Sequence, residues 1–169
     1  SLYPEIVDIG MGSHVVGSGK WARLSYTDQN DSFKQFRLLA VDPHYLSTFN
    51  IRSSQGRLFD PSSDLDKRQS VILNETAVSY FNLEDPIGER LPGNDFGDHA
   101  IVGVVKDFNY ASLHTAIEPL VIVQNVQPIV DGTSDFNFQD SPIPKMVFKY
   151  KGSQLTKLKA IIEREWEST

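Results

Sequence analysis

The stretch that most suggests chemistry is a glycine- and serine-rich loop followed by lysine, GSHVVGSGKW, at residues 12–21. A phosphate-binding loop needs a glycine, four further residues, then Gly-Lys and a hydroxyl residue that holds magnesium. Counting back from Gly19 and Lys20 places His14 where the first glycine belongs and Trp21 where the hydroxyl belongs. Because the motif fails at two positions, the sequence argues against nucleotide binding.

Metal-ligating side chains show no ligand spacing. The histidines are His14, His44, His99 and His114, and no two of them stand in the H-x-x-x-H relation that places two imidazoles on one helix face. We therefore expect four isolated surface histidines. The chain has no cysteine, which excludes disulfides and thiolate metal sites.

Acidic residues gather in two turn-rich segments. Asp60, Asp64 and Asp66 lack the D-x-D-x-D-G register and the closing glutamate of a calcium loop, so we expect a solvated loop there. Asp95 and Asp98 lie in a second acidic, turn-prone segment. Neither pattern predicts a metal site.

The candidate nucleophiles and acid-base pairs also lack the spacing that catalysis requires. Ser18 stands in GSG rather than in the G-x-S-x-G elbow of a serine hydrolase. Lys106 and Asp107 end the apolar run IVGVV, but neighbouring residues of a strand point to opposite faces and could not act together on one substrate. We interpret this pair as a strand end that reaches solvent. The sequence predicts no catalytic, cofactor-binding or metal-binding residue, and a hydrolytic enzyme is only a third hypothesis.

The elements that would position these residues are mostly strands. Alternating or continuous apolar runs predict strands at residues 6–11, 21–26, 36–41, 70–73, 100–105, 119–123 and 145–150. Helices are predicted after Asp42, with Asp42 as cap and Asn50 in the left-handed conformation that ends it, and over residues 74–81 with Asn74 as cap. Residues 56–69 are predicted to be a loop and residues 124–144 an irregular excursion.

The chain is expected to close with an amphipathic helix over residues 153–169. Its apolar stripe consists of Leu155, Leu158, Ile161, Ile162 and Trp166. Because strands and short helices do not alternate regularly, we predict the α+β class with mixed sheets.

Size and charge limit the function classes. A chain of 169 residues and 19.0 kDa is long enough for one domain, or for two small lobes. The net charge of −6, with basic residues scattered, argues against a nucleic-acid partner. No apolar run approaches the roughly 18–20 residues that span a bilayer.

Three stretches read together resemble a family. They are RLLAVDPHYLSTFNIRSSQGRLF, SVILNETAVSYFNLEDPIGERL and IVGVVKDFNYASLHTAIEPLVI. In this order and spacing they resemble the periplasmic core domain of MacB-like and FtsX-like ABC transporter permeases, in the style common in Bacteroidetes. The resemblance covers about half of the chain.

The resemblance implies a two-lobed fold. Both chain ends, residues 1–55 and 143–169, would form a porter-like lobe near the membrane, and residues 56–142 would form an inserted sabre-like lobe. The long C-terminal amphipathic helix would lead toward the second transmembrane helix of the parent permease.

The resemblance also implies a non-catalytic role without a cofactor. The domain would be the periplasmic part of an inner-membrane protein and would couple cytoplasmic ATP hydrolysis to conformational change and partner contact in export, lipoprotein release or signalling. Its partners would be the permease's own transmembrane helices, the cytoplasmic ABC ATPase indirectly, and a periplasmic accessory protein or a second permease copy. The alternative is an extracytoplasmic ligand-binding or sensor domain for a peptide or lipid.

Overall fold

The computed structural model describes most of the chain. The described residues are 3–18, 21–27, 32–93, 96, 98–111, 114–131, 135–137 (backbone only), 144–152 and 155–167. The strands are β1 (Ile6–Gly12), β2 (Ala22–Thr27), β3 (Phe33–Ala40), β4 (Ser53–Gly56), β5 (Ser70–Asn74), β6 (Ala100–Val105), β7 (Leu120–Val123), β8 (Asp135–Asn137) and β9 (Lys145–Tyr150). The helices are α1 (Tyr45–Thr48), α2 (Asp64–Gln69), α3 (Glu75–Tyr80), α4 (Gln127–Val130) and α5 (Leu155–Glu167).

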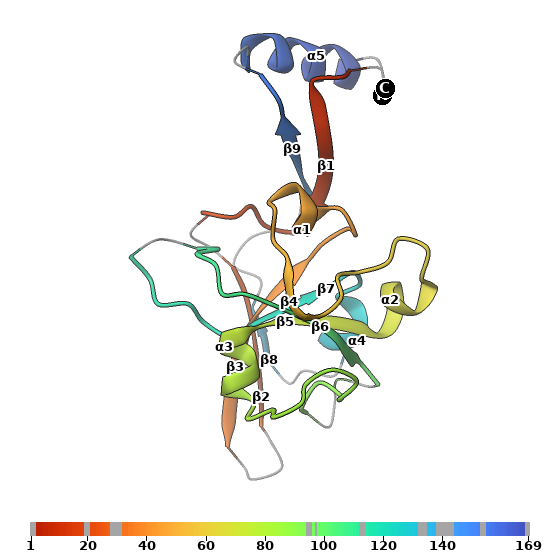
Figure 1. Cartoon of the computed structure of the whole chain (residues 1–169). Coiled ribbons are helices and arrows are strands. Elements are labelled where there is room, and N and C mark those ends of the chain that lie inside the picture. The colour runs from red at the N-terminus through yellow and green to blue at the C-terminus, as the bar shows by residue number, and fades with distance from the viewer. Residues whose placement is uncertain are drawn as a thin grey trace.

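A mixed sheet of seven strands, in the order β4-β6-β5-β7-β3-β2-β8, forms the centre of the molecule (Figure 1). The pairs β3/β7 and β5/β6 are parallel, and the other neighbours are antiparallel. With short helices around this sheet and a longer helix at the C-terminal end, the chain has the predicted α+β class. We call the seven-stranded sheet with α2, α3 and α4 the body.

The two central strands are buried on both faces, which explains their continuous apolar sequence. Along β5, Val71 and Leu73 belong to the apolar cluster on one face, and Ile72 belongs to the cluster on the other. In β7, Val121 and Ile122 divide between the two faces in the same way. This alternation follows from the two-residue period of a strand.

Strands β1 and β9 pair away from this sheet, as an antiparallel ribbon that carries α5 (Figure 1). We call β1, β9 and α5 the stalk, because they project from one side of the body. At the far end of the stalk the Tyr3 hydroxyl donates to Glu165 Oε1 (2.6 Å), so the two ends of the described chain lie together. On α5, Leu158 is buried, whereas Leu155 and Trp166 of the predicted stripe are 72% and 75% exposed.

Helix α1 lies at the junction of stalk and body and packs directly on β1. A Cβ atom at Gly10 would lie 2.5 Å from Tyr45 Cα, and one at Gly12 would lie 2.6 Å from the Tyr45 ring. The close approach of α1 to the ribbon therefore depends on two positions without side chains.

The predicted caps are confirmed. Asp42 Oδ1 accepts hydrogen bonds from the backbone N–H groups of His44 (3.1 Å) and Tyr45 (2.8 Å), and Asn50 has φ 57°. Asn74 Oδ1 accepts from the backbone N–H of Ala77 (2.9 Å) at the start of α3.

Two predictions on the loops are wrong, and one strand was missed. Helix α2 lies within the predicted loop 56–69, because the Ser63 side chain caps it by accepting from the backbone N–H of Asp66. The predicted excursion 124–144 contains α4 and β8, and the edge strand β4 was not predicted. Within the described ranges, no helix combines the length and the apolarity needed to cross a bilayer.

Candidate functional site

The histidines do not lie where the sequence predicts. His44 and His114 are exposed, but His14 and His99 are buried, so the expectation of four surface histidines is wrong for two of them. No group of three or more His, Asp or Glu side chains in the described part of the chain could hold a metal ion.

The imidazole of His14 is a packing element. Its ring stacks on Trp21 with 5.0 Å between centroids, and Nε2 accepts from the backbone N–H of Ala22 (3.3 Å). Nδ1 lies 2.9 Å from Ser13 Oγ, which also accepts from the backbone N–H of Ala40 (3.1 Å). His14 therefore ties the loop after β1 to strands β2 and β3.

The false phosphate loop is built differently from a phosphate cradle. Gly19 and Lys20 lie outside the described residues. The carbonyl of Ser18 accepts a hydrogen bond from Trp21 Nε1 (2.7 Å), and the Trp21 side chain is buried. The tryptophan that replaces the magnesium-binding hydroxyl thus belongs to the core.

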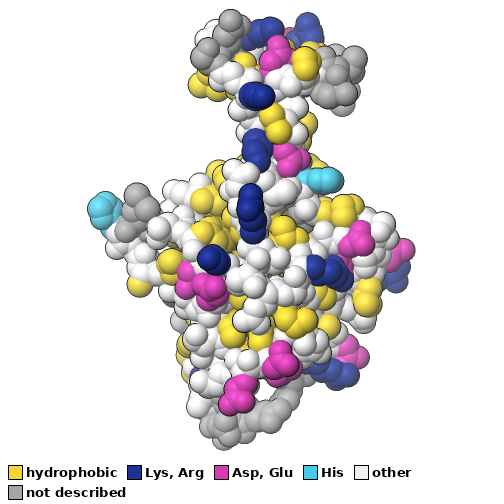
Figure 2. Space-filling model, viewed as in Figure 1, with side chains coloured by type: hydrophobic (Ala, Val, Ile, Leu, Met, Phe, Trp, Pro, Cys, Tyr) yellow, Lys and Arg dark blue, Asp and Glu magenta, His cyan; other side chains and the backbone are white. Residues whose placement is uncertain are grey.

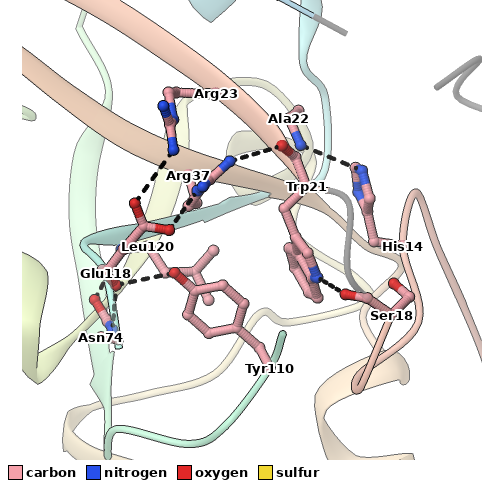
Figure 3. Close-up of polar contacts among 10 residues, drawn as sticks. All are labelled: His14, Ser18, Trp21, Ala22, Arg23, Arg37, Asn74, Tyr110, Glu118 and Leu120. Atoms are coloured by element: carbon pink, nitrogen blue, oxygen red, sulfur yellow. Dashed lines mark hydrogen bonds and ion pairs between the residues drawn. The ribbon is translucent and has the colours of Figure 1, made fainter. Parts of the chain in front are cut away.

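A polar network joins β2, β3, β5 and β7 next to this tryptophan (Figure 3). Arg37 donates through Nε to Glu118 Oε2 (2.7 Å) and through Nη1 to the carbonyl of Trp21 (3.0 Å). Arg23 approaches the other oxygen of Glu118, at 3.5 Å. The carboxylate therefore links two neighbouring strands to the start of β7.

The buried end of this network is Asn74. Its Oδ1 accepts from the backbone N–H of Leu120 (2.9 Å) as well as from Ala77, and its Nδ2 donates to the carbonyl of Glu118 (3.1 Å). The Tyr110 hydroxyl donates to that same carbonyl (3.1 Å), and burial together with the negative charge of Glu118 raises the pKa of Tyr110 to about 12. These polar atoms satisfy one another, so the network has a structural role.

The acidic segment around α2 is not a solvated loop. Asp66 is buried, and its carboxylate accepts from both terminal nitrogens of Arg57, from the backbone N–H of Asp60 (2.8 Å) and from Ser70 Oγ (2.8 Å). The hydrogen bonds from Arg57 lower the pKa of Asp66 to about 2, against the opposing effect of burial. Asp60 and Asp64 are exposed, as predicted.

The remaining candidates are surface groups. The Asp107 carboxylate accepts from the backbone N–H (3.0 Å) and the hydroxyl (2.7 Å) of Thr76, and so holds the first turn of α3. Lys106 is exposed, which confirms that IVGVV ends where the strand reaches solvent. Asp98 pairs with Arg90 at 2.7 Å, and Asp95 lies outside the described residues.

Two hollows remain as candidate binding surfaces. The junction cleft, of about 890 Å³, lies where the stalk meets the body and is lined by residues that include Met11, Asp42, Lys67 and Gln124. The Gln124 Nε2 atom is buried and has no hydrogen-bond partner in the described structure.

The stalk groove, of about 620 Å³, lies between the ribbon and α5. Its lining residues are Tyr3, Ile6, Ile9, Met146, Phe148, Ile161, Ile162, Glu165 and Trp166. Sequence reasoning missed both hollows, although the strand predicted at residues 145–150 supplies two of the lining residues of the stalk groove, Met146 and Phe148.

Comparison with known proteins identifies relatives of this architecture. The sequence profile of the family described as MacB-like periplasmic core domain matches residues 5–163. No curated protein matched the chain by sequence.

Similar solved structures share the fold at low sequence identity. The periplasmic region of MacB from Actinobacillus actinomycetemcomitans has a TM-score of 0.59 and 16% identity, over 98% of this chain and 68% of that one. A domain of a protein described as a permease, from Porphyromonas gingivalis, has a TM-score of 0.56 and 15% identity, over 98% of this chain and 66% of that one. The extracellular domain of the noncanonic ABC-type transporter YknZ from Gram-positive bacteria has a TM-score of 0.55 and 14% identity, over 91% of this chain and 71% of that one. The chain thus spans about two thirds of the length of these structures.

Proposed function

Because the chain belongs to the family of MacB-like periplasmic core domains, we propose that it is a non-catalytic moving part of an ABC transporter permease. In this role it couples ATP hydrolysis in the cytoplasm to a conformational change and to partner contact outside the membrane. The output is export, lipoprotein release or signalling. The ATPase acts on the domain indirectly, through the permease's transmembrane helices.

The observation that carries this proposal is the placement of the chain ends. Tyr3 binds Glu165, and Lys157 binds Glu5 at 2.9 Å, so both ends of the described chain lie at the far end of the stalk. A displacement applied there passes along two hydrogen-bonded strands into the junction with the body. The mixed sheet would move as a rigid unit in response to such a displacement, because its central strands are buried on both faces.

We further propose the two-lobe division for this domain. Residues 1–55 and 143–169 form the porter-like lobe and residues 56–142 the sabre-like lobe. The pairing of β1 with β9 supports a lobe built from both chain ends. In this division the lobes share one sheet, because β3 of the first pairs with β7 of the second.

The test is a distance measurement in the full permease with its ATPase. This chain has no cysteine, so once any cysteines elsewhere in the permease and the ATPase are replaced, spin labels can be placed by introducing pairs of cysteines. Leu155→Cys on α5 with Leu65→Cys on α2 reports the position of the stalk relative to the body, and both sites are exposed. Phe33→Cys with Leu65→Cys is the control within the body.

We expect the distance between stalk and body to differ between the nucleotide-free and the vanadate-trapped transporter, while the control distance stays constant. Identical distances in both states, with normal ATP hydrolysis, would contradict the proposal. So would normal output from a permease that lacks this domain.

A second candidate function is ligand sensing in the junction cleft. Its volume is within the roughly 300–1,000 Å³ of small-molecule sites. Gln124 lines the cleft, and its amide nitrogen, which is buried and has no partner among the described residues, could reach a ligand carbonyl or carboxylate only if the side chain turned toward the cleft. A thermal-shift screen with peptides and lipids tests it, since a ligand that binds only the folded state raises the melting temperature.

A further inference from the structure

The outer edge of β9 is open. The carbonyl of Met11 accepts from the backbone N–H of Asp42 (2.8 Å), so the polar backbone groups of Met11 point away from β9. In an antiparallel pair, residues that face each other point their backbone groups either both inward or both outward. Met146 lies opposite Met11, and Phe148 lies opposite Ile9, two residues along the strand. The backbone N–H and C=O groups of Met146 and Phe148 therefore point away from β1. No backbone partner for that outward side occurs in the described part of the chain.

The outer edge of β1, in contrast, is closed. Asp8 Oδ1 accepts from the backbone N–H of Ile9 (3.0 Å), and Asp42 binds the carbonyl of Met11. A register shift between Ile6 and Asp8 interrupts the rest of this edge. Proteins commonly protect edge strands in these ways, so the stalk leaves one of its two edges for pairing.

An apolar surface lies beside the open edge. Met146 and Phe148 point into the stalk groove together with Ile9, and Trp166 of α5 forms its rim. Met146 is 45% exposed and Trp166 is 75% exposed. An added strand would therefore place alternate side chains against this groove.

The lysines of β9 indicate which side chains an added strand would carry on the face that points away from the stalk groove. Lys145 and Lys149 alternate with the groove residues on β9, and the exposed Lys151 follows them. Lys149 donates to the uncharged Asn50 side chain. Figure 2 shows basic side chains spaced along the visible side of the stalk.

The same lysines disfavour two of the registers in which a second copy of this chain could pair. Antiparallel pairing of two β9 strands with Met146 opposite Phe148 would set Lys145 opposite Lys149. With Phe148 opposite itself, Lys145 would face Lys151. Like charges directly opposite each other destabilise a strand pair.

We propose that β9 binds an extended partner segment by strand addition, with apolar residues in the stalk groove and acidic residues on the face of Lys145 and Lys149. The inference rests on the proposed function, because it specifies the partner contact made by the same domain. It is tested on the isolated chain, so its failure would leave the distance measurement in the full permease unaffected.

The probe is a fluorescein-labelled peptide of alternating valine and glutamate, followed by fluorescence anisotropy. The matched peptide has lysine in place of glutamate. We expect the glutamate peptide to bind at least about tenfold more tightly than the lysine peptide, with a difference that shrinks as salt screens the charges. Lys149→Glu should reduce or reverse this preference.

Met146→Pro tests the edge itself. Because the Met146 N–H points away from β1, proline removes an edge donor without removing a hydrogen bond of the ribbon. We expect about tenfold weaker peptide binding, as for the loss of one hydrogen bond. Leu155→Ala is the control, since Leu155 is exposed on the stalk but does not line the groove.

Hydrogen exchange of the unmodified chain gives a readout that needs no variant. The backbone amides of Met146 and Phe148 should exchange more slowly when the glutamate peptide is bound. Absence of that protection, equal affinity for the two peptides, or dimerisation of the chain through this edge would each overturn the proposal.

Discussion

Replacing Asp66 by asparagine isolates the energy of the buried carboxylate. The side chain keeps its size but loses its negative charge. In the parent chain, Arg57 and Ser70 donate hydrogen bonds to that charged carboxylate. A carboxyl whose pKa falls from 3.8 to about 2 on folding gains about 2 kcal/mol of stability at neutral pH, at about 1.36 kcal/mol for each unit.

The sign of the pH dependence follows from the lowered pKa. The contribution of Asp66 is fully present above the pKa of the unfolded carboxyl, near 4, and is lost as the pH falls toward 2. We therefore expect Asp66→Asn to reduce the free energy of unfolding by about 2 kcal/mol at pH 7 and to have a much smaller effect near pH 2. For a chain of this size that loss at neutral pH lowers the melting temperature by about 4–8 °C.

Urea denaturation of the parent chain and the variant between pH 7 and pH 2.5 measures both quantities. Asp64→Asn is the matched control, because Asp64 lies on the same helix but is exposed, and its stability change should be small at every pH. An equal loss for Asp66→Asn at both ends of the pH range would refute the reasoning, since the cost would then come from packing and not from charge.

Three further changes test other parts of the structure. Gly103→Ala would place a Cβ atom 2.0 Å from the carbonyl oxygen of Arg57, so we expect a loss of about 3 kcal/mol in urea denaturation; a neutral result would contradict the close packing of β4 on β6. Asn74→Ala leaves the backbone N–H of Leu120 without its acceptor and should cost about 2–4 kcal/mol, whereas a loss below 0.5 kcal/mol, at roughly the level of a surface substitution, would contradict the network. Burial raises the pKa of Tyr45 to about 12, so the stability that the neutral Tyr45 side chain contributes should be lost as the pH rises from about 10 toward 12. Because Tyr110 also has a pKa of about 12, Tyr45→Phe should reduce the phenolate absorbance that develops near pH 12 and leave the part due to Tyr110; an unchanged titration would count against the burial of Tyr45.

Local features of the fold could be predicted because their causes are local. The apolar run of β7 predicts a strand buried on two faces, and Asn74 stands where a strand ends and a helix begins. A glycine within an apolar strand, such as Gly103, is typical of a close backbone approach, and the Arg57 carbonyl makes that approach here. The residues between Ser63 and Asp66 also carry a cap signal, but the polar composition around them favoured a loop.

Contacts that follow no helix or strand period could not be predicted in this way. His14 stacks on Trp21, seven residues later, and Asp66 binds Arg57, nine residues earlier. The pairing of β1 with β9 joins residues that are about 140 positions apart, and no local pattern encodes it. The stalk groove depends on that pairing, so it was missed for the same reason.

The pairing of Ile6 with Tyr150 also sets an order of events during synthesis. Within this domain, β1 is made before the strands of the body, and its partner β9 is made after them. The body can assemble its sheet in the interval, while IVDIGMG waits as an unpaired, apolar strand. Contacts over so long a separation form slowly, so we expect β1 to stay unpaired, and open to wrong pairing, until β9 emerges.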